Sequence, residues 1–119
     1  MVSFKELTVW QKSHELTVSI YRTTKEFPAE EKFALVSQLR RAASSVPANI
    51  AEGFSRKTLK EYIQFLFNAR GSLSEVEYFL ILSTDLEYID KKKFKNLEAQ
   101  VRTVGKLLNG LINSLRSKK

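Results

Sequence analysis

QLRRAASSVPANIAEG, residues 38–53, is the stretch that decides the fold. At the turn of about 100° per residue of an α-helix, its apolar side chains share one narrow face: Leu39, Ala42, Ala43, Val46 and Ile50. A polar line of residues three or four apart runs beside that face: Gln38, Arg41, Ser45, Asn49 and Glu52. A helix with two such stripes packs on two sides, which predicts the central helix of a bundle. The polar line is interpreted as a subunit interface or as structural pairs that fix the helix register, in preference to a ligand site.

Pro47 interrupts this pattern, because it has no amide proton for the carbonyl of Ala43 and its ring crowds that turn. We predict a kinked but continuous helix over residues 28–53. The alternative is a break at Ser45 with a new start at Pro47. Pro28 suits a first helical turn, and Gly53 is predicted to end the helix in a left-handed conformation.

Three further helices are predicted from capping residues and helical spacing. Ser3 with Glu6 and Thr58 with Glu61 have the spacing of capping boxes, and Asp90 is a good N-cap. The expected helices span about 4–26, 28–53, 58–86 and 90–115. Short connections and the absence of strand patterns predict an all-α fold, a single domain over 1–119 built as an antiparallel up-down-up-down four-helix bundle.

The third predicted helix is apolar on almost every side between Tyr78 and Leu82. A helix of that kind is normally buried all round, which four helices of one chain cannot achieve. We therefore expect subunit contacts there, with Phe79 and Leu82 in the interface beside the polar line of residues 38–52. Gly71 and Ser72 would allow another helix to approach closely.

The net charge of +7 is placed unevenly along the chain. Residues 1–89 carry eleven Lys/Arg and eleven Asp/Glu, whereas residues 90–119 carry nine Lys/Arg and two acidic residues, so the whole excess lies in the last quarter. Five cations fall within about 80° of the surface of the fourth predicted helix: Lys91, Lys95, Arg102, Lys106 and Arg116. Such a line suits contact with phosphates. The plainer interpretation is a solvated helix face.

The same composition argues against several classes of function. There is no cysteine, and His14 is the only histidine, which leaves few candidates for a catalytic triad or a metal site. Neither a signal peptide nor a membrane span is visible, which favours a cytoplasmic protein. Most aromatic residues sit at predicted core positions, so no exposed platform for stacking bases is expected. We expect no enzymatic activity, no cofactor, no metal and no membrane partner.

Residues 38–53, followed by YIQFLFNARGSLSEVE at 62–77, carry a resemblance to a known family. Together with FKELTVW at 4–10 and Phe27-Pro28, they make the chain similar to the 23S rRNA intervening-sequence proteins, also called four helix bundle proteins. The resemblance covers nearly the whole chain. It implies a small bacterial protein related to the accessory variability proteins of diversity-generating retroelements, which form homopentamers with basic surfaces. It implies no enzymatic activity and assigns no residue a role.

From residues and resemblance together we expect a non-catalytic, oligomeric helical bundle that binds RNA or DNA through a basic surface without reading sequence. The alternative is a structural scaffold or adaptor that binds a protein partner and has no nucleic-acid role.

Overall fold

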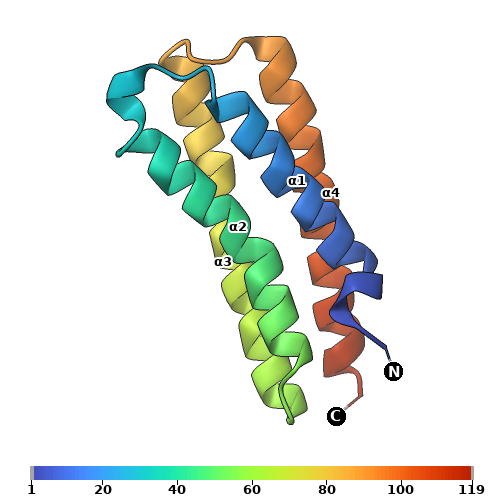
Figure 1. Ribbon diagram of the computed structural model, residues 1–119. Helices are drawn as coiled ribbons and strands as arrows, with labels where there is room; N and C mark the ends of the chain where they lie inside the picture. Colours follow the sequence, from blue (N-terminus) through green and yellow to red (C-terminus); the bar gives the residue numbers. More distant parts are fainter. Residues whose placement is uncertain (1, 119) are drawn as a thin grey trace.

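A computed structural model describes residues 2–118, which form a rod of 47 × 24 × 22 Å. Its four helices are α1 (Thr8–Thr24), α2 (Leu35–Phe54), α3 (Leu59–Asp85) and α4 (Lys91–Arg116), with single 3₁₀ turns η1 (Phe4–Glu6) and η2 (Ala29–Glu31). Successive helices run in opposite directions along the rod (Figure 1). Between residues 2 and 118 there is no strand, so the predicted all-α, up-down-up-down four-helix bundle is confirmed.

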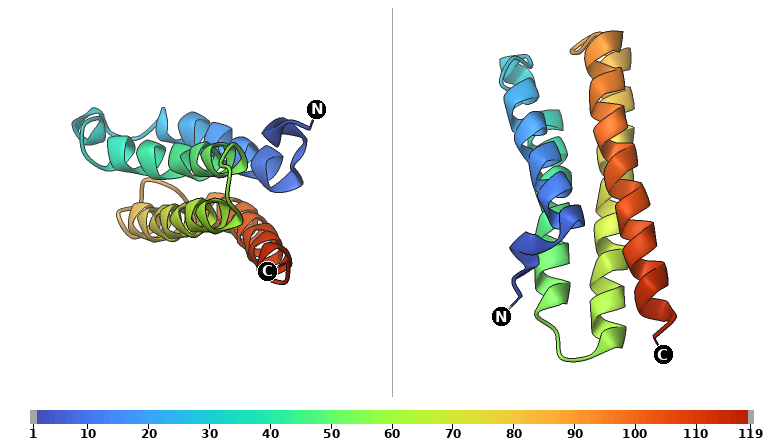
Figure 2. Two further views of the ribbon diagram at one scale, coloured as in Figure 1. Left: turned by 90° about the horizontal axis from the view of Figure 1, so that it is seen from below. Right: turned by 90° about the vertical axis from the view of Figure 1, so that its right-hand side faces the viewer.

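The four helices lie in two layers, α1 with α2 and α3 with α4 (Figure 2). Each helix packs on two neighbours, and the packing of α2 on α3 is the most extensive. The core is filled by branched aliphatic side chains from all four helices, among them the fully buried Leu16, Ile20, Leu39, Ile50, Leu66, Leu80, Leu97, Leu108 and Ile112. The connection between α1 and α2 and that between α3 and α4 meet at one end of the rod, and the chain termini and the α2–α3 turn lie at the other (Figure 1).

α2 is continuous through Pro47, which rules out the break at Ser45. The carbonyl of Ala43, which Pro47 cannot serve, accepts instead from the Thr17 hydroxyl of α1 at 3.0 Å. The Thr17 oxygen also lies 2.9 Å from the carbonyl of Ser13, so its single proton is shared between two acceptors. Both Thr17 and Ala43 are buried, where an unpaired carbonyl is costly. A side chain from α1 therefore compensates for the proline in α2.

Two predicted helix starts were wrong. Ser3 caps only the single 3₁₀ turn η1, through a hydroxyl that accepts from the amide of Lys5; extended Leu7 then separates this turn from α1, which begins at Thr8. α2 does not begin at Pro28 either, because residues 29–31 form η2 and Ala34 leaves the helical conformation. The physical reason at this second site is Glu31, whose carboxylate accepts from the amide of Leu35 at 3.3 Å and so caps α2 from four residues upstream.

Gly53 does not end α2 in a left-handed conformation, and this prediction was also wrong. Within residues 2–118 no glycine has a positive φ, and α2 continues to Phe54. Gly53 is buried where α2 meets α3: a Cβ added to it would lie 2.8 Å from the Cβ of Phe65 and 3.2 Å from the carbonyl oxygen of Tyr62. The glycine is needed for close approach of two helices. Among residues 2–118, the positive φ is found at Glu87, at 64°, in the α3–α4 connection.

The caps predicted for the last two helices are confirmed. Thr58 Oγ1 accepts from the amide of Glu61 at 3.1 Å and donates to its carboxylate at 2.8 Å. Asp90 Oδ1 accepts from the amide of Lys93 at 2.7 Å. These caps set where α3 and α4 begin, and the cap of α4 sets the register of its charged face.

Candidate nucleic-acid interface

The five predicted phosphate contacts all lie exposed on one side of α4 and are called the α4 strip: Lys91, Lys95, Arg102, Lys106 and Arg116. With a rise of about 1.5 Å per residue, the strip is about 38 Å long. The opposite side of α4 packs in the core through Leu97, Val104 and Leu108. Among residues 2–118, the only ion pair of the strip joins Arg102 to Glu98, at 3.3 Å.

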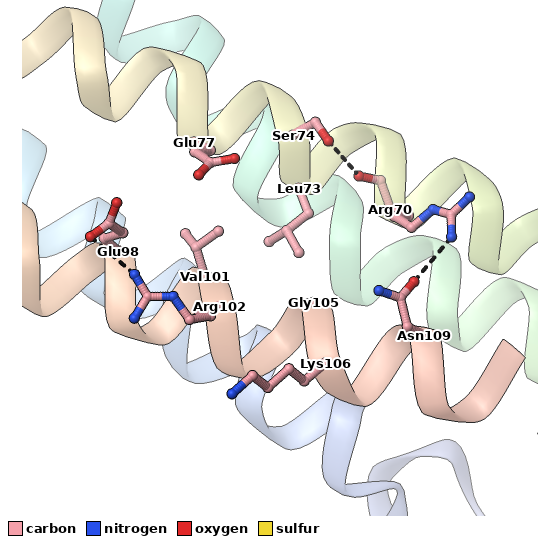
Figure 3. Close-up of a pocket in the computed structure, with 10 residues that line it drawn as sticks. All are labelled: Arg70, Leu73, Ser74, Glu77, Glu98, Val101, Arg102, Gly105, Lys106 and Asn109. Atoms are coloured by element: carbon pink, nitrogen blue, oxygen red, sulfur yellow. Dashed lines mark hydrogen bonds and ion pairs between the residues drawn. The ribbon is translucent and has the colours of Figure 1, made fainter. Parts of the chain in front are cut away.

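The middle of the α4 strip borders an open hollow of about 320 Å³ between α3 and α4 (Figure 3). Arg102 and Lys106 line it, and α3 adds Arg70, which sequence reasoning had not placed there. Glu77 and Glu98 lie toward one end of this hollow, and Arg70 toward the other, where it donates to Asn109 Oδ1 at 3.0 Å (Figure 3). The hollow thus presents both signs of charge.

Arg116 and Arg70 both stack near the ring of Phe67, a half-buried residue of α3. The guanidinium carbons lie 5.0 Å and 4.8 Å from the centre of the ring. Contacts of this kind hold a guanidinium at a defined place on the surface while its N–H groups still face water. Arg70 therefore extends the α4 strip onto α3.

The polar line of α2 is engaged mostly within α2 and with α3. Asn49 donates to the carbonyl and the hydroxyl of Ser45 at 2.8 Å and 2.9 Å, and the Ser45 hydroxyl lies 2.9 Å from that of Ser72. Glu52 pairs with Arg56 at 2.7 Å, which ties down the start of the α2–α3 turn. Gln38 and Arg41 are exposed. Three of the five residues of the line thus form structural pairs, and the other two, Gln38 and Arg41, face outward.

Gln38 and Arg41 border a second open hollow, of about 430 Å³, between α2 and α3. It is lined by both signs of charge, from Arg41 and Glu75, and by the aromatic rings of Phe33 and Phe79. Phe79 and Leu82 are half-buried and pack against the core of the chain's own bundle. On the remaining side of the apolar run, Tyr78 is 57% exposed and Ile81 43% exposed.

Sequence reasoning missed a further group of residues on α1, on α2 and in the connection between them. Exposed aromatic rings were not expected, yet Phe33 is 89% and Tyr21 41% exposed. Lys32 and Arg40 lie beside these rings. Their positive charge could not be read from a count along the chain, because acidic residues balance it over residues 1–89.

The remaining candidate residues form no recognisable chemical site. His14 is exposed and stacks on Trp10, with ring centres 5.2 Å apart. In the described part of the chain, no group of three or more His, Cys, Asp or Glu side chains is placed to hold a metal ion. A search for membrane-crossing segments over the same residues found none of sufficient length and apolarity.

Comparisons with known proteins agree with this architecture. A crystal structure of a protein with unknown function from the S23 ribosomal protein family of Bacteroides thetaiotaomicron superposes with a TM-score of 0.82. It shares 30% sequence identity with the chain, and the match covers 88% of this chain and 95% of that one. No similar protein was found among curated sequences. The model of the 23S rRNA-intervening sequence protein family matches residues 5–110. Because the family model matches nearly the whole chain and the related structure shares its fold, the chain belongs to the 23S rRNA-intervening sequence protein family.

Proposed function

We propose that this protein is a non-catalytic nucleic-acid-binding bundle, and that the α4 strip contacts the phosphate backbone of RNA or DNA. The observation that carries the proposal is the concentration of the whole net charge of +7 in residues 90–119, together with the exposure of all five strip cations on one side of α4. A line of about 38 Å follows a nucleic-acid backbone over many phosphates. The printed names of the family and of its S23 relative refer to ribosomal RNA and ribosomal proteins, which is in keeping with this proposal.

Binding of this kind does not read sequence. Specific readout requires a helix or strand whose side chains reach base edges in a groove, whereas lysine and arginine along one helix face meet only phosphates. The affinity of one strip is expected to be weak and strongly dependent on salt, with the logarithmic slope steepening by about 0.9 for each phosphate contacted on duplex DNA.

Self-assembly would multiply such weak contacts, and we propose a homo-oligomer built through the α2–α3 face. The hollow with Arg41, Glu75 and Phe79 combines both charge signs with apolar area, the composition of a protein–protein contact. Several strips on one particle bind a long polyanion with an avidity far above that of one strip. The resemblance to the accessory proteins of retroelements makes a pentameric ring the assembly we propose.

The experiment is a mobility-shift and anisotropy titration of Lys95→Glu/Arg102→Glu against duplex DNA and RNA over a series of salt concentrations. The double variant is expected to lose binding at physiological salt, because it replaces two phosphate contacts by repulsion. Lys57→Glu/Lys60→Glu is the matched control, since it makes the same change in net charge at exposed residues outside α4.

Equal binding by the double variant and wild type would refute the assignment of the α4 strip. Failure of wild type to bind any nucleic acid at physiological salt, with recovery of a defined protein partner instead, would favour the scaffold or adaptor function.

A further inference from the structure

The end of the rod that holds the α1–α2 connection has a second basic surface, here called the connection hollow. It consists of two adjoining depressions of about 340 and 480 Å³ that share Lys32, Val36 and Arg40. Six side chains define its chemistry: Tyr21, Lys25, Lys32, Phe33, Arg40 and Arg41. It lies in the α1–α2 layer, whereas the α4 strip lies in the other layer (Figure 2).

The connection hollow carries a single sign of charge. Within residues 2–118, none of its four cations takes part in an ion pair, and no carboxylate lines either depression. The hollow between α3 and α4, by contrast, includes Glu77 and Glu98. Cations that are gathered in a concave surface whose lining holds no carboxylate attract a polyanion more strongly than the same cations spread along a neutralised surface. The complementary ligand is therefore negatively charged.

Arg40 is held in place inside the connection hollow. Its Nε donates to Thr24 Oγ1 at 2.9 Å, its Nη2 donates to the carbonyl of Tyr21 at 3.2 Å, and its guanidinium lies 4.6 Å from the centre of the Tyr21 ring. These contacts leave the Nη1 group free to donate. A positioned guanidinium loses little conformational entropy when it binds a phosphate.

Phe33 gives the connection hollow its second property. At 89% exposure its ring packs against almost nothing, although a phenylalanine side chain gains about 1.5–3 kcal/mol when it is fully buried. Lys32 Nζ lies 5.4 Å from the centre of the ring. An open aromatic face among cations is the arrangement by which proteins hold unpaired bases, since the base stacks on the ring while its phosphates meet the charges.

We propose that the connection hollow binds a single-stranded segment of nucleic acid, with a base stacked on Phe33 and the flanking phosphates on Lys32 and Arg40. A duplex cannot use Phe33, because its bases are already stacked within the helix. The site is separate from the α4 strip and does not depend on it. A protein that carries both would hold a backbone on α4 and an unpaired segment at the end of the rod.

The test uses fluorescence anisotropy with labelled single strands of about twelve nucleotides, within the range of known single-strand sites, as DNA and as RNA, and with the corresponding duplexes. Phe33→Ala is expected to weaken binding of the single strands about tenfold or more and to change duplex binding less than twofold. Phe33→Tyr should retain the affinity of wild type. Lys25→Gln/Lys32→Gln should weaken single-strand binding and flatten its salt dependence.

Leu86→Ala is the control, because Leu86 is an exposed apolar residue that lies outside both the connection hollow and the proposed subunit interface. Light scattering and circular dichroism on each variant establish that mass and fold are unchanged. Unchanged single-strand affinity in Phe33→Ala would overturn the proposal. So would a loss of assembled mass in Phe33→Ala, since the ring would then be a contact between subunits, or equal losses of single-strand affinity in Phe33→Ala and Leu86→Ala.

The two proposals can fail separately. Lys95→Glu/Arg102→Glu tests the α4 strip through duplex binding, and the tenfold effect of Phe33 on single strands is expected to persist in that background. Loss of the Phe33 effect there would overturn the independence of the two sites.

Discussion

Replacing Thr17 by valine tests how α1 compensates for the proline in α2. The substitution keeps the shape of the side chain but removes the hydroxyl that lies 3.0 Å from the carbonyl of Ala43. Pro47 provides no amide for that carbonyl, and Ala43 is fully buried, so the carbonyl loses its partner without gaining water. A buried acceptor left unpaired costs about 1–3 kcal/mol. At about 4 °C for each kcal/mol in a domain of this size, the expected fall in Tm is roughly 4–12 °C.

Repeating Thr17→Val in a Pro47→Ala background isolates the effect of the missing amide. Alanine restores the amide that donates to the carbonyl of Ala43, so Thr17→Val should then cost less than about 1 kcal/mol. The resulting coupling of about 1–2 kcal/mol exceeds the few tenths expected of independent sites. Thr103→Val on exposed α4, where the hydroxyl also donates to a helix carbonyl, is the control and should change stability by less than about 0.5 kcal/mol.

Urea unfolding followed by circular dichroism at a fixed protein concentration gives all the required free energies. The mechanism is refuted if Thr17→Val costs the same with and without Pro47, or no more than Thr103→Val.

Three further predictions concern other parts of the bundle. Gly53→Ala should lower the free energy of unfolding by about 1–2 kcal/mol, because overpacking against Phe65 exceeds the gain in helix propensity. Gly110→Ala should raise the free energy of unfolding by up to about 1 kcal/mol, because the added methyl group meets nothing within 4 Å. Chemical denaturation distinguishes the two signs. The hydrogen bond from Tyr88 to Glu31, 2.7 Å long, raises the pKa of Tyr88. The stabilisation by this hydrogen bond is therefore complete below the ordinary tyrosine pKa of about 10 and is lost as pH rises through the raised pKa. Tyr88→Phe should abolish this alkaline loss of stability in denaturation curves measured across that range. Asn49→Arg should dissociate the proposed oligomer because it places a bulky cation in the polar line of α2; a wild type that is monomeric by light scattering would contradict the proposed assembly.

Local signals in the sequence predicted much of this fold correctly. Thr58 and Asp90 cap their helices through bonds to residues three positions on, so the beginnings of α3 and α4 could be predicted. The start of α2 could not, because Glu31, which caps it, is also held by Tyr88, a residue 57 positions away. The role of Gly53 depends on the approach of Phe65 from another helix.

The candidate sites divide in the same way. The exposure of the α4 strip follows from the amphipathic pattern of a single helix, and it was predicted from that pattern alone. The connection hollow depends on the packing of α1 on α2, which brings Tyr21 and Lys25 beside Arg40 and Arg41 while Glu31 turns toward Leu35 and Tyr88. The positive and negative charges of residues 1–89 cancel, so a count along the chain does not predict this group of cations.

The positions of the chain ends have a practical consequence. Both ends of the chain lie near the α2–α3 turn, at the opposite end of the 47 Å rod from the α1–α2 connection (Figure 1). A reporter enzyme, dye or surface linker can therefore be attached at either terminus without shielding the α1–α2 connection. Immobilised in this way, molecules would present that connection outward to whatever flows past.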